Sequence, residues 1–372
     1  KYSYLVGLVG KVTKNTIIDS SSFTGNTVTH GTYTGGLAEI NEGFIVNCNP
    51  NSISADGKSY VGGLVGLNKN VTFTEKTYKD VKNTEHKYAS TPIKNVTMNN
   101  TNISGKNIVG GVTAENYGTI LDVTGTNILM KWSNGDYIGG IAGWNYEGAS
   151  ISNSGNGDVT YNRSNIYGNR YVGGIAGGSK GYIGGKDGNS FIIMDQYCYI
   201  SAMNSYAGGA VGYYELKNNN GLAFIKYDGR LDSIMDYSGG IAGIVNVGDT
   251  STSAAIHDCI VAGGSNYRIN SMMGNSGGIT TKNSALIENC IITSGKQVTA
   301  SKLAGGIASE NRGTIKNCYV MAENDLAATG ISWASRFATS STSSAYIQGK
   351  NNVGGITGDN YGTIEDCCVH GA

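Results

Sequence analysis

Cysteine is the first residue type in this sequence whose spacing could carry chemistry. Five of the seven cysteines follow an Asn or an Asp: Cys48, Cys259, Cys290, Cys318 and Cys367. The last four are separated by 31, 28 and 49 residues, and the sequence has no C-x-x-C pair of the kind that binds zinc. Thiols at equivalent positions of a repeat would be buried as small apolar groups. We therefore expect an inward-facing thiol ladder, although the separation of neighbouring repeats would also permit disulfides.

A serine nucleophile is the second possibility that the sequence raises. Residues 177–181 and 274–278 both match the G-x-S-x-G pattern of serine hydrolases. That pattern requires a strand-to-helix turn, with an acid and a His further along the chain. The four histidines lie far apart, and the H-E-x-x-H, P-loop and dinucleotide-binding signatures are missing. The sequence predicts no catalytic, cofactor-binding or metal-binding residues, so we expect a protein that is not an enzyme.

Acidic and aromatic residues suggest carbohydrate chemistry as a third possibility. A polysaccharide-cleaving β-helix needs carboxylates that come together from neighbouring repeats. Asp122 and Asp366 instead occupy the position that holds Asn47 and Asn317 in other repeats, which indicates a turn. Asp187 resembles part of a calcium-binding nonapeptide, but the full repeat is missing and a structural turn is favoured. A recurring Tyr could pack repeat against repeat, or form an exposed stripe that stacks on sugars.

All of these residues belong to an internal repeat built on paired glycines. Relative to the first Gly of each pair, position +6 is Asn in seven copies and position −2 is Tyr in six. Position +2 is apolar, and position +12 is Asn or Asp in five copies. The shortest steps between pairs, 27 to 29 residues, define the unit, and a degraded copy at residues 6–10 makes eleven units. The pairs begin at Gly35, Gly62, Gly110, Gly139, Gly173, Gly208, Gly239, Gly277, Gly305 and Gly354.

A unit of this length predicts one coil of a parallel β-solenoid. The units consist of short β-branched runs between Gly, Asn and Asp turns, without helical periodicity. They are too short for a propeller blade, which needs ~40–45 residues. Coils would stack ~4.8 Å apart, so that equivalent Asn amides hydrogen-bond from coil to coil. Because Ile at +10 and Cys at +13 have opposite strand parity, we expect the chain to bend at +12.

These patterns predict an all-β fold, a parallel β-solenoid of about eleven coils. We expect a single domain over residues 1–372, with loop insertions at about residues 74–106 and 323–350. Solenoid insertions often gather on one binding face, although solvated decoration without a partner is the simpler interpretation. Both ends still read as repeat sequence, so we expect end-to-end self-association or a longer parent chain.

Composition excludes several other classes of protein. The 27 basic and 27 acidic residues balance, which argues against a nucleic-acid binder. No apolar run approaches 18 residues, so we expect no membrane span in this segment. With 39% hydrophobic residues the chain is too apolar for a disordered protein.

Two units carry a resemblance to a known family. Residues 305–318 read Gly-Gly-Ile-Ala-Ser-Glu-Asn-Arg-Gly-Thr-Ile-Lys-Asn-Cys, and residues 354–367 follow the same pattern. They resemble the GLUG-motif repeats of bacterial secreted and surface-anchored proteins, named for Gly-Leu-apolar-Gly. Residues 7–10 and 63–66, both Gly-Leu-Val-Gly, match the name itself, and the resemblance spans all eleven units. It implies an extracellular or cell-surface stalk or adhesin-like module, with no catalytic residues in the repeats.

We therefore expect a non-catalytic extracellular structural or adhesive module, either an adhesin stalk or a filament subunit. Its loops would bind a host or matrix glycan or protein, and no cofactor is expected. The alternative is a carbohydrate-binding or carbohydrate-active parallel β-helix. A groove lined by three or more carboxylates from successive coils would favour the enzyme, and an exposed Tyr row the binder. Ice binding would need a regular Thr ladder, and no Thr position is shared by most units.

Overall fold

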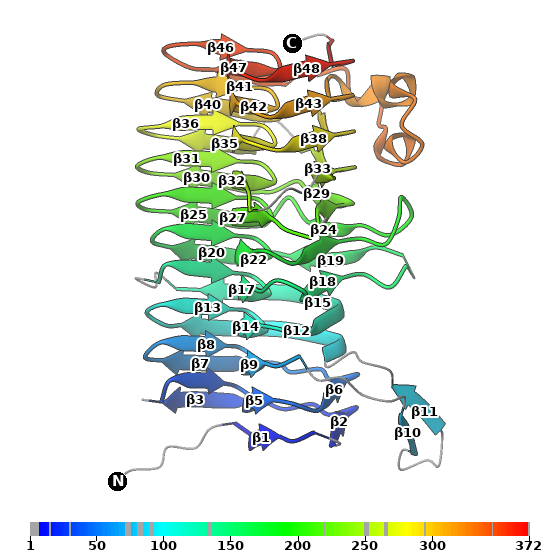
Figure 1. Ribbon diagram of the computed structural model, residues 1–372. Coiled ribbons are helices and arrows are strands. Elements are labelled where there is room, and N and C mark those ends of the chain that lie inside the picture. The colour runs from blue at the N-terminus through cyan, green and yellow to red at the C-terminus, as the bar shows by residue number, and fades with distance from the viewer. Residues whose placement is uncertain are drawn as a thin grey trace.

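The chain folds into a parallel β-solenoid, seen in a computed structural model (Figure 1). The coils are stacked along one axis, with the N-terminus at one end and the C-terminus at the other (Figure 1). The predicted fold class is therefore confirmed. The structure describes residues 7–14, 16–29, 31–70, 76–79, 85–88, 93–131, 135–155, 157–218, 220–248, 253–263, 267–293, 295–343 and 345–370.

Two long parallel sheets flank each Gly-Gly pair. The sheet that follows the pairs has 11 strands: β1 (Val9–Val12), β5 (Ala38–Asn41), β9 (Val65–Asn68), β14 (Thr113–Asn116), β17 (Ala142–Asn145), β22 (Ala176–Ser179), β27 (Val211–Leu216), β32 (Ala242–Val247), β37 (Thr280–Asn283), β42 (Ala308–Asn311) and β47 (Thr357–Asn360). The sheet that runs into the pairs has 10 strands: β4 (Tyr33–Gly35), β8 (Tyr60–Gly62), β13 (Ile108–Gly110), β16 (Tyr137–Gly139), β21 (Tyr171–Gly173), β26 (Tyr206–Gly208), β31 (Tyr237–Gly239), β36 (Asn275–Gly277), β41 (Ala304–Gly305) and β46 (Val353–Gly354).

The remaining coil strands form three columns, which the long strands β12 and β15 join. The first column is β2 (Ile17–Asp19), β6 (Phe44–Val46), β12 (Ile93–Ser104), β15 (Thr119–Met130), β18 (Ser150–Ser152), β23 (Tyr182–Gly184), β28 (Leu222–Ala223), β33 (Ala254–His257), β38 (Leu286–Glu288), β43 (Thr314–Lys316) and β48 (Thr363–Glu365). The second adds β3 (Gly25–Thr29), β7 (Ile53–Gly57), β20 (Asn165–Gly168), β25 (Tyr199–Ala202), β30 (Arg230–Ser233), β35 (Arg268–Ser271), β40 (Gln297–Ala300) and β45 (Tyr346–Gln348). The third adds β19 (Val159–Asn162), β24 (Ile192–Met194), β29 (Ile225–Tyr227), β34 (Ile260–Val261), β39 (Ile291–Ile292), β44 (Tyr319–Val320) and β49 (Cys368–Val369).

The corner predicted at position +12 is present. There the Asn or Asp residue adopts the left-handed conformation, which these side chains tolerate better than most. The φ angles lie between 50° and 54° at Asn47, Asp122, Asn289, Asn317 and Asp366, and Asp258, which precedes Cys259 in a longer coil, has a φ of 53°. This single reversal lets the Ile at +10 and the Cys at +13 both point inward.

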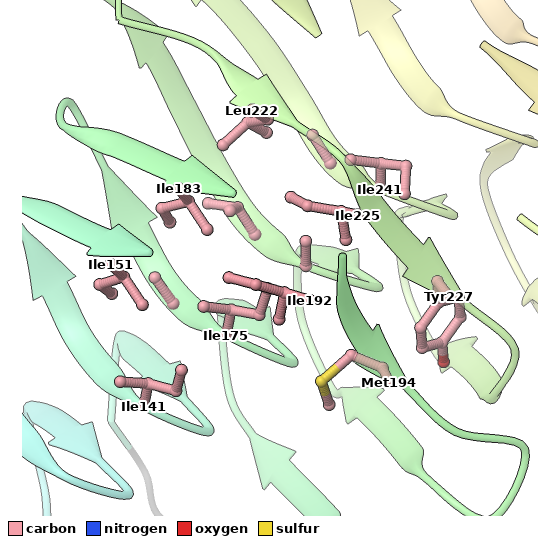
Figure 2. Packing of buried hydrophobic residues seen from close by; sticks show 14 of the residues in the cluster. Ile141, Ile151, Ile175, Ile183, Ile192, Met194, Leu222, Ile225, Tyr227 and Ile241 are labelled. Carbon is pink, nitrogen blue, oxygen red and sulfur yellow. The ribbon is translucent and has the colours of Figure 1, made fainter. Parts of the chain in front are cut away.

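The core is made of apolar side chains stacked from coil to coil. Figure 2 shows one segment, in which Ile151, Ile183 and Leu222 come from neighbouring strands of the first column. Ile141 and Ile175, at position +2, are at most 1% exposed. Because each strand pairs in register with its equivalent, every position of the repeat produces its own stack.

The Asn at position +6 forms the predicted amide ladder inside the rod. The Nδ2 of Asn41 donates to the Oδ1 of Asn68 over 2.9 Å. Asn68 donates to Asn116, and Asn116 to Asn145, each over 2.8 Å. A second run links Asn283, Asn311 and Asn360. These bonds satisfy polar groups that would otherwise be costly to bury.

Both insertions are shorter than predicted. Residues 93–104, assigned to the first insertion, form β12 and pair in register with β15, so this stretch belongs to the coils. Residues 346–348 of the second likewise form β45 against β40. The first insertion contributes a hairpin of β10 (Lys76–Lys79) and β11 (Glu85–Tyr88). This hairpin and the second insertion project from the rod on the side of the first column (Figure 1). The sequence of β12 lacks a strict apolar alternation, because the strand bends at Asn95 and Asn100, both in the left-handed conformation.

The second insertion is not solvated decoration. It contains two 3-10 helices, η1 (Glu323–Thr329) and η2 (Ala334–Phe337), which pack on the solenoid. Trp333 is only 4% exposed, contacts Phe191, and donates its Nε1–H to Asp258 over 2.9 Å. Neither 3-10 helix, and no other helix in the described part of the chain, is long and apolar enough to span a membrane.

Candidate functional site

The two G-x-S-x-G segments are parts of the solenoid coils, and neither forms the strand-to-helix turn of a serine hydrolase. Ser179 ends strand β22, is fully buried, and occupies the +6 position of the amide ladder, where it accepts from Asn145. Ser276 lies within strand β36 and donates to the carbonyl oxygen of Thr299 over 2.6 Å. Asp187 accepts from the backbone N–H of Asn189, as expected of a turn. Each therefore has a structural partner within the coil.

A thiol ladder runs through neighbouring coils from Cys259 to Cys367, whereas Cys48 lies apart in an earlier coil, and none of these sulfur atoms forms a disulfide. Cys48, Cys259, Cys290 and Cys318 are fully buried, and Cys367 is half-buried; all five are free thiols. In each coil the thiol donates to the carbonyl oxygen two residues earlier, as in Cys290 to Glu288 over 3.3 Å. Burial raises the pKa of the Cys290 and Cys318 thiols well above the ordinary value. High pKa and burial make these sulfurs unreactive.

We predict that thiol titration of the native protein labels Cys368 quickly and Cys367 slowly. Cys368 is exposed, whereas Cys367 is half-buried, and its pKa is raised by its contact with Cys318 and by burial. The other five thiols should react only after denaturation, giving seven in total. A Cys368→Ser variant should lose the fast phase alone. Fast labelling of three or more thiols in the folded protein would contradict the buried ladder.

The most distinctive surface of the rod is an aromatic face over the two sheets that flank the Gly-Gly pairs. Its rings come from position −2 and from positions +5 and +7 of successive coils. Except for Tyr117, which is 37% exposed, the rings are half-buried. The aromatic face consists of Tyr33, Tyr60, Tyr117, Tyr137, Trp144, Tyr146, Tyr171, Tyr206, Tyr213 and Tyr237.

The Tyr residues at position −2 pack against one another along the axis. The rings of Tyr137 and Tyr171 stack with centroids 4.8 Å apart and planes 12° apart. Tyr171 and Tyr206, and Tyr206 and Tyr237, continue the stack at 5.6 Å and 4.8 Å. Neighbouring rings cover one another's faces, so this row presents its edges and hydroxyl groups outward.

A second set of rings, missed by the sequence analysis, lies beside this row. Trp144 in β17 and Tyr213 in β27 both stand at position +5, with centroids 6.0 Å apart and planes 24° apart. Each meets the Tyr row edge-on: Trp144 packs against Tyr137 at 82° and Tyr213 against Tyr171 at 73°. The in-register pairing of β17, β22 and β27 brings these positions together.

Glu115 lies beneath the aromatic face and is held by two phenols. It is 5% exposed, and its carboxylate accepts from the hydroxyls of Tyr33 and Tyr146, each over 2.6 Å. Burial, together with these bonds, raises the pKa of both phenols, which therefore remain donors at neutral pH. Glu115 and Glu215 stand at different positions of β14 and β27, with β17 and β22 between them. These two carboxylates therefore do not stand at equivalent positions of successive coils.

Charged residues at the edge of the aromatic face neutralise one another. Lys180 and Glu215 form an ion pair of 3.0 Å, and the hydroxyl of Tyr213 donates to Glu215 over 2.9 Å. Burial opposes ionisation of Glu215, but the bonds from Lys180 and Tyr213 outweigh it and lower its pKa. Lys217 lies 3.8 Å from both Glu215 and Glu147. This edge offers hydrogen-bonding groups with little net charge.

Comparison of the chain with protein-family models, with curated proteins and with solved structures gives no match. The aromatic face therefore has to be interpreted from its own geometry. Among the described residues, no group of three or more His, Cys, Asp or Glu side chains is placed to hold a metal ion.

An open pocket of about 300 Å³ lies where the second insertion meets the solenoid. Its charged groups have partners in the protein: Lys226 pairs with Asp228, and Glu323 accepts from Thr293. Nearby Lys296 is fully buried and donates from Nζ to the carbonyl oxygens of Gly229 over 2.6 Å and Asp228 over 3.1 Å. Lys296 thus joins the backbones of separate coils.

We predict that Lys296 makes the stability of the rod depend on pH. Burial lowers the pKa of Lys296 to about 7 from the ordinary 10.5. Between these values the unfolded chain binds the proton that the folded chain has lost, so the free energy of unfolding rises with pH by at most about 1.4 kcal/mol per unit. Below pH 7 both states are protonated and this contribution is flat. In urea unfolding from pH 6 to pH 10, the free energy of unfolding of wild type and of the exposed-lysine control Lys302→Met should rise relative to that of Lys296→Met, which shares every other titrating group. Parallel curves of unfolding free energy against pH for all three proteins would refute this role of Lys296.

Proposed function

We propose that this chain is a non-catalytic adhesive repeat module, a rod that displays the aromatic face outside the cell. The observation that carries the proposal is the aromatic face itself, whose mostly half-buried rings extend from β4 to β31 with a gap at Ile108 of β13. Monomeric proteins seldom expose contiguous apolar patches without a binding role. The resemblance to GLUG-motif repeats of secreted and surface proteins agrees with this role and with an extracellular location.

The amide and core ladders support the mechanical part of the proposal. Each coil is joined to the next by parallel backbone pairing and by a buried side-chain hydrogen bond in the Asn runs. A rod of this kind resists bending and holds its lateral face in a fixed orientation. Axial continuation, by a longer chain or a second copy, belongs to the same proposal. Electron microscopy over a concentration series would distinguish filaments from discrete rods.

Adhesion under flow tests the proposed function directly. Beads coated with the purified chain would pass over surfaces of neutral polysaccharide, mucin, collagen or fibronectin, with albumin-coated beads as the reference. We expect retention on at least one surface, and loss of that retention when the aromatic face carries Trp144→Ala and Tyr213→Ala together. Retention no greater than that of albumin beads on every surface would overturn the adhesive role.

A carbohydrate-active enzyme is the alternative function. It would need two carboxylates facing each other across a bound sugar. Incubation with the same polysaccharides, followed by assays for new reducing ends and for unsaturated uronates, decides between the two. Turnover by the purified chain would replace the adhesive proposal.

A further inference from the structure

The ring of Trp144 lies over Gly178, the equivalent residue of the next coil. The two residues pair in register, and Gly178 pairs in turn with Tyr213. A Cβ atom at Gly178 would lie 2.1 Å from Cζ3 of Trp144 and 2.3 Å from Cε3. The indole therefore occupies the space above the glycine and extends across that coil towards Tyr213. The absence of a side chain at this one position allows the two rings to approach within 6.0 Å.

The two rings form a platform rather than another layer of the Tyr stack. Their planes are 24° apart, whereas the planes of Tyr137 and Tyr171 meet them at 82° and 73°. One face of the indole covers Gly178, and Trp144 itself remains partly exposed. The edges of Tyr137 and Tyr171 form a wall along one side. We refer to Trp144 and Tyr213 as the platform.

Flat aromatic faces bordered by a few hydrogen-bonding groups match the chemistry of sugar rings. A pyranose has one face of C–H groups that packs on an aromatic ring, and hydroxyls at its edge that need polar partners. Lys180 and Glu215 supply a donor and an acceptor beside Tyr213. The centroids of the two platform rings are 6.0 Å apart, and the rings follow one another along the axis of the rod.

The charge at this edge indicates which glycans fit. Two lysines and two glutamates, Lys180, Lys217, Glu147 and Glu215, lie within 3.8 Å of an opposite charge. A polyanion or a polycation would have to break these pairs, whereas a neutral hydroxyl-rich chain would hydrogen-bond to them as they stand.

We propose that the Trp144–Tyr213 platform binds two neighbouring sugar rings of a neutral polysaccharide that runs along the solenoid. This assignment rests on the proposed adhesive function and names its ligand class. Gly178 is a positioning residue: it does not contact the sugar, but its lack of a side chain leaves room for the indole of Trp144.

Affinity electrophoresis through gels containing a β-glucan, a galactomannan or dextran tests the assignment. We expect at least one neutral polysaccharide to retard the wild-type chain, and Trp144→Ala and Tyr213→Ala each to weaken binding about tenfold or more. Gly178→Leu should weaken it similarly while both rings are kept. The matched control is Tyr346→Ala, which removes a 54% exposed ring from β45, on a different sheet, and should bind as wild type. Circular dichroism confirms that each variant is folded.

Three results would overturn the assignment. They are the absence of retardation by any neutral polysaccharide, platform variants that bind as well as Tyr346→Ala, and binding confined to alginate, hyaluronate or chitosan. If the coated beads still adhere to collagen or fibronectin in any of these cases, the adhesive function stands and only the ligand class is wrong. If the beads adhere to nothing, the adhesive function fails as well.

Discussion

Gly110→Ala is expected to destabilise the solenoid by about 4 kcal/mol, more than most single core substitutions. The added Cβ would lie 1.8 Å from the carbonyl oxygen of Thr113 and 2.7 Å from the backbone N of Gly143. Both are backbone atoms, and the N–H of Thr113 is itself bonded to Ile141 of the next coil. Relief of the overlap must therefore separate coils. Because φ at Gly110 is outside the left-handed region, space alone requires glycine here.

Urea unfolding followed by far-ultraviolet circular dichroism measures this loss, and hydrogen exchange in β14 and β17 locates it. Gly10→Ala is the matched control, since its added Cβ has no atom within 4 Å, and it should change stability by less than about 0.5 kcal/mol. Equal urea midpoints for the two variants would mean that the Gly-Gly bend tolerates a methyl group and that the close approach does not constrain the fold.

The same crowding recurs at every Gly-Gly pair and explains why the motif was detectable. The first glycine always faces the carbonyl oxygen three residues on, as in Gly62 towards Val65 at 1.8 Å. The second faces the next coil, as in Gly111 towards the carbonyl oxygen of Gly140 at 1.8 Å. Positions that pack closely against their own copies accept few residue types, and the two glycines of each pair accept only one. The period, the amide ladder and the +12 corner could therefore be predicted from residue identities alone.

Outward positions lack this restriction, and there the sequence was much less informative. Position +5 holds Glu115, Trp144, Gly178 and Tyr213 in consecutive coils, so no agreement between copies marks it. The Tyr at −2 was detected because it repeats, but its partners at +5 and +7 emerge only once the coil register is known. Trp333 lies within the second insertion, and its partner Asp258 is 75 residues away in the sequence. Contacts of this kind are not periodic.

The second large loss of stability is expected when Asn116, at the centre of the amide ladder, is replaced. Asn116 is fully buried; its Oδ1 accepts from Asn68 and from the backbone N–H of Gly118, and its Nδ2 donates to Asn145. Asn116→Ala leaves the Asn68 amide and the Gly118 N–H without this acceptor inside the rod. Each buried group left unpaired costs about 1–3 kcal/mol, so we expect a loss of about 3 kcal/mol in the free energy of unfolding.

Two further variants separate the ladder from the mere loss of side-chain volume. Asn360→Ala removes the same group at the exposed end of the ladder and should cost less than about 1 kcal/mol. Asn116→Ser should recover part of the loss, because Ser179 already serves this position, accepting from Asn145 over 3.1 Å. If serine is no better than alanine at position 116, the stability of this coil comes from apolar stacking and backbone pairing, and the amide ladder sets only the register. If serine recovers part of the loss, the hydrogen bond carries the energy, and the coils of β27 and β32 must replace it by other means. There Tyr214 and Val245, both fully buried, stand at the ladder position and exchange the hydrogen bond for apolar contact.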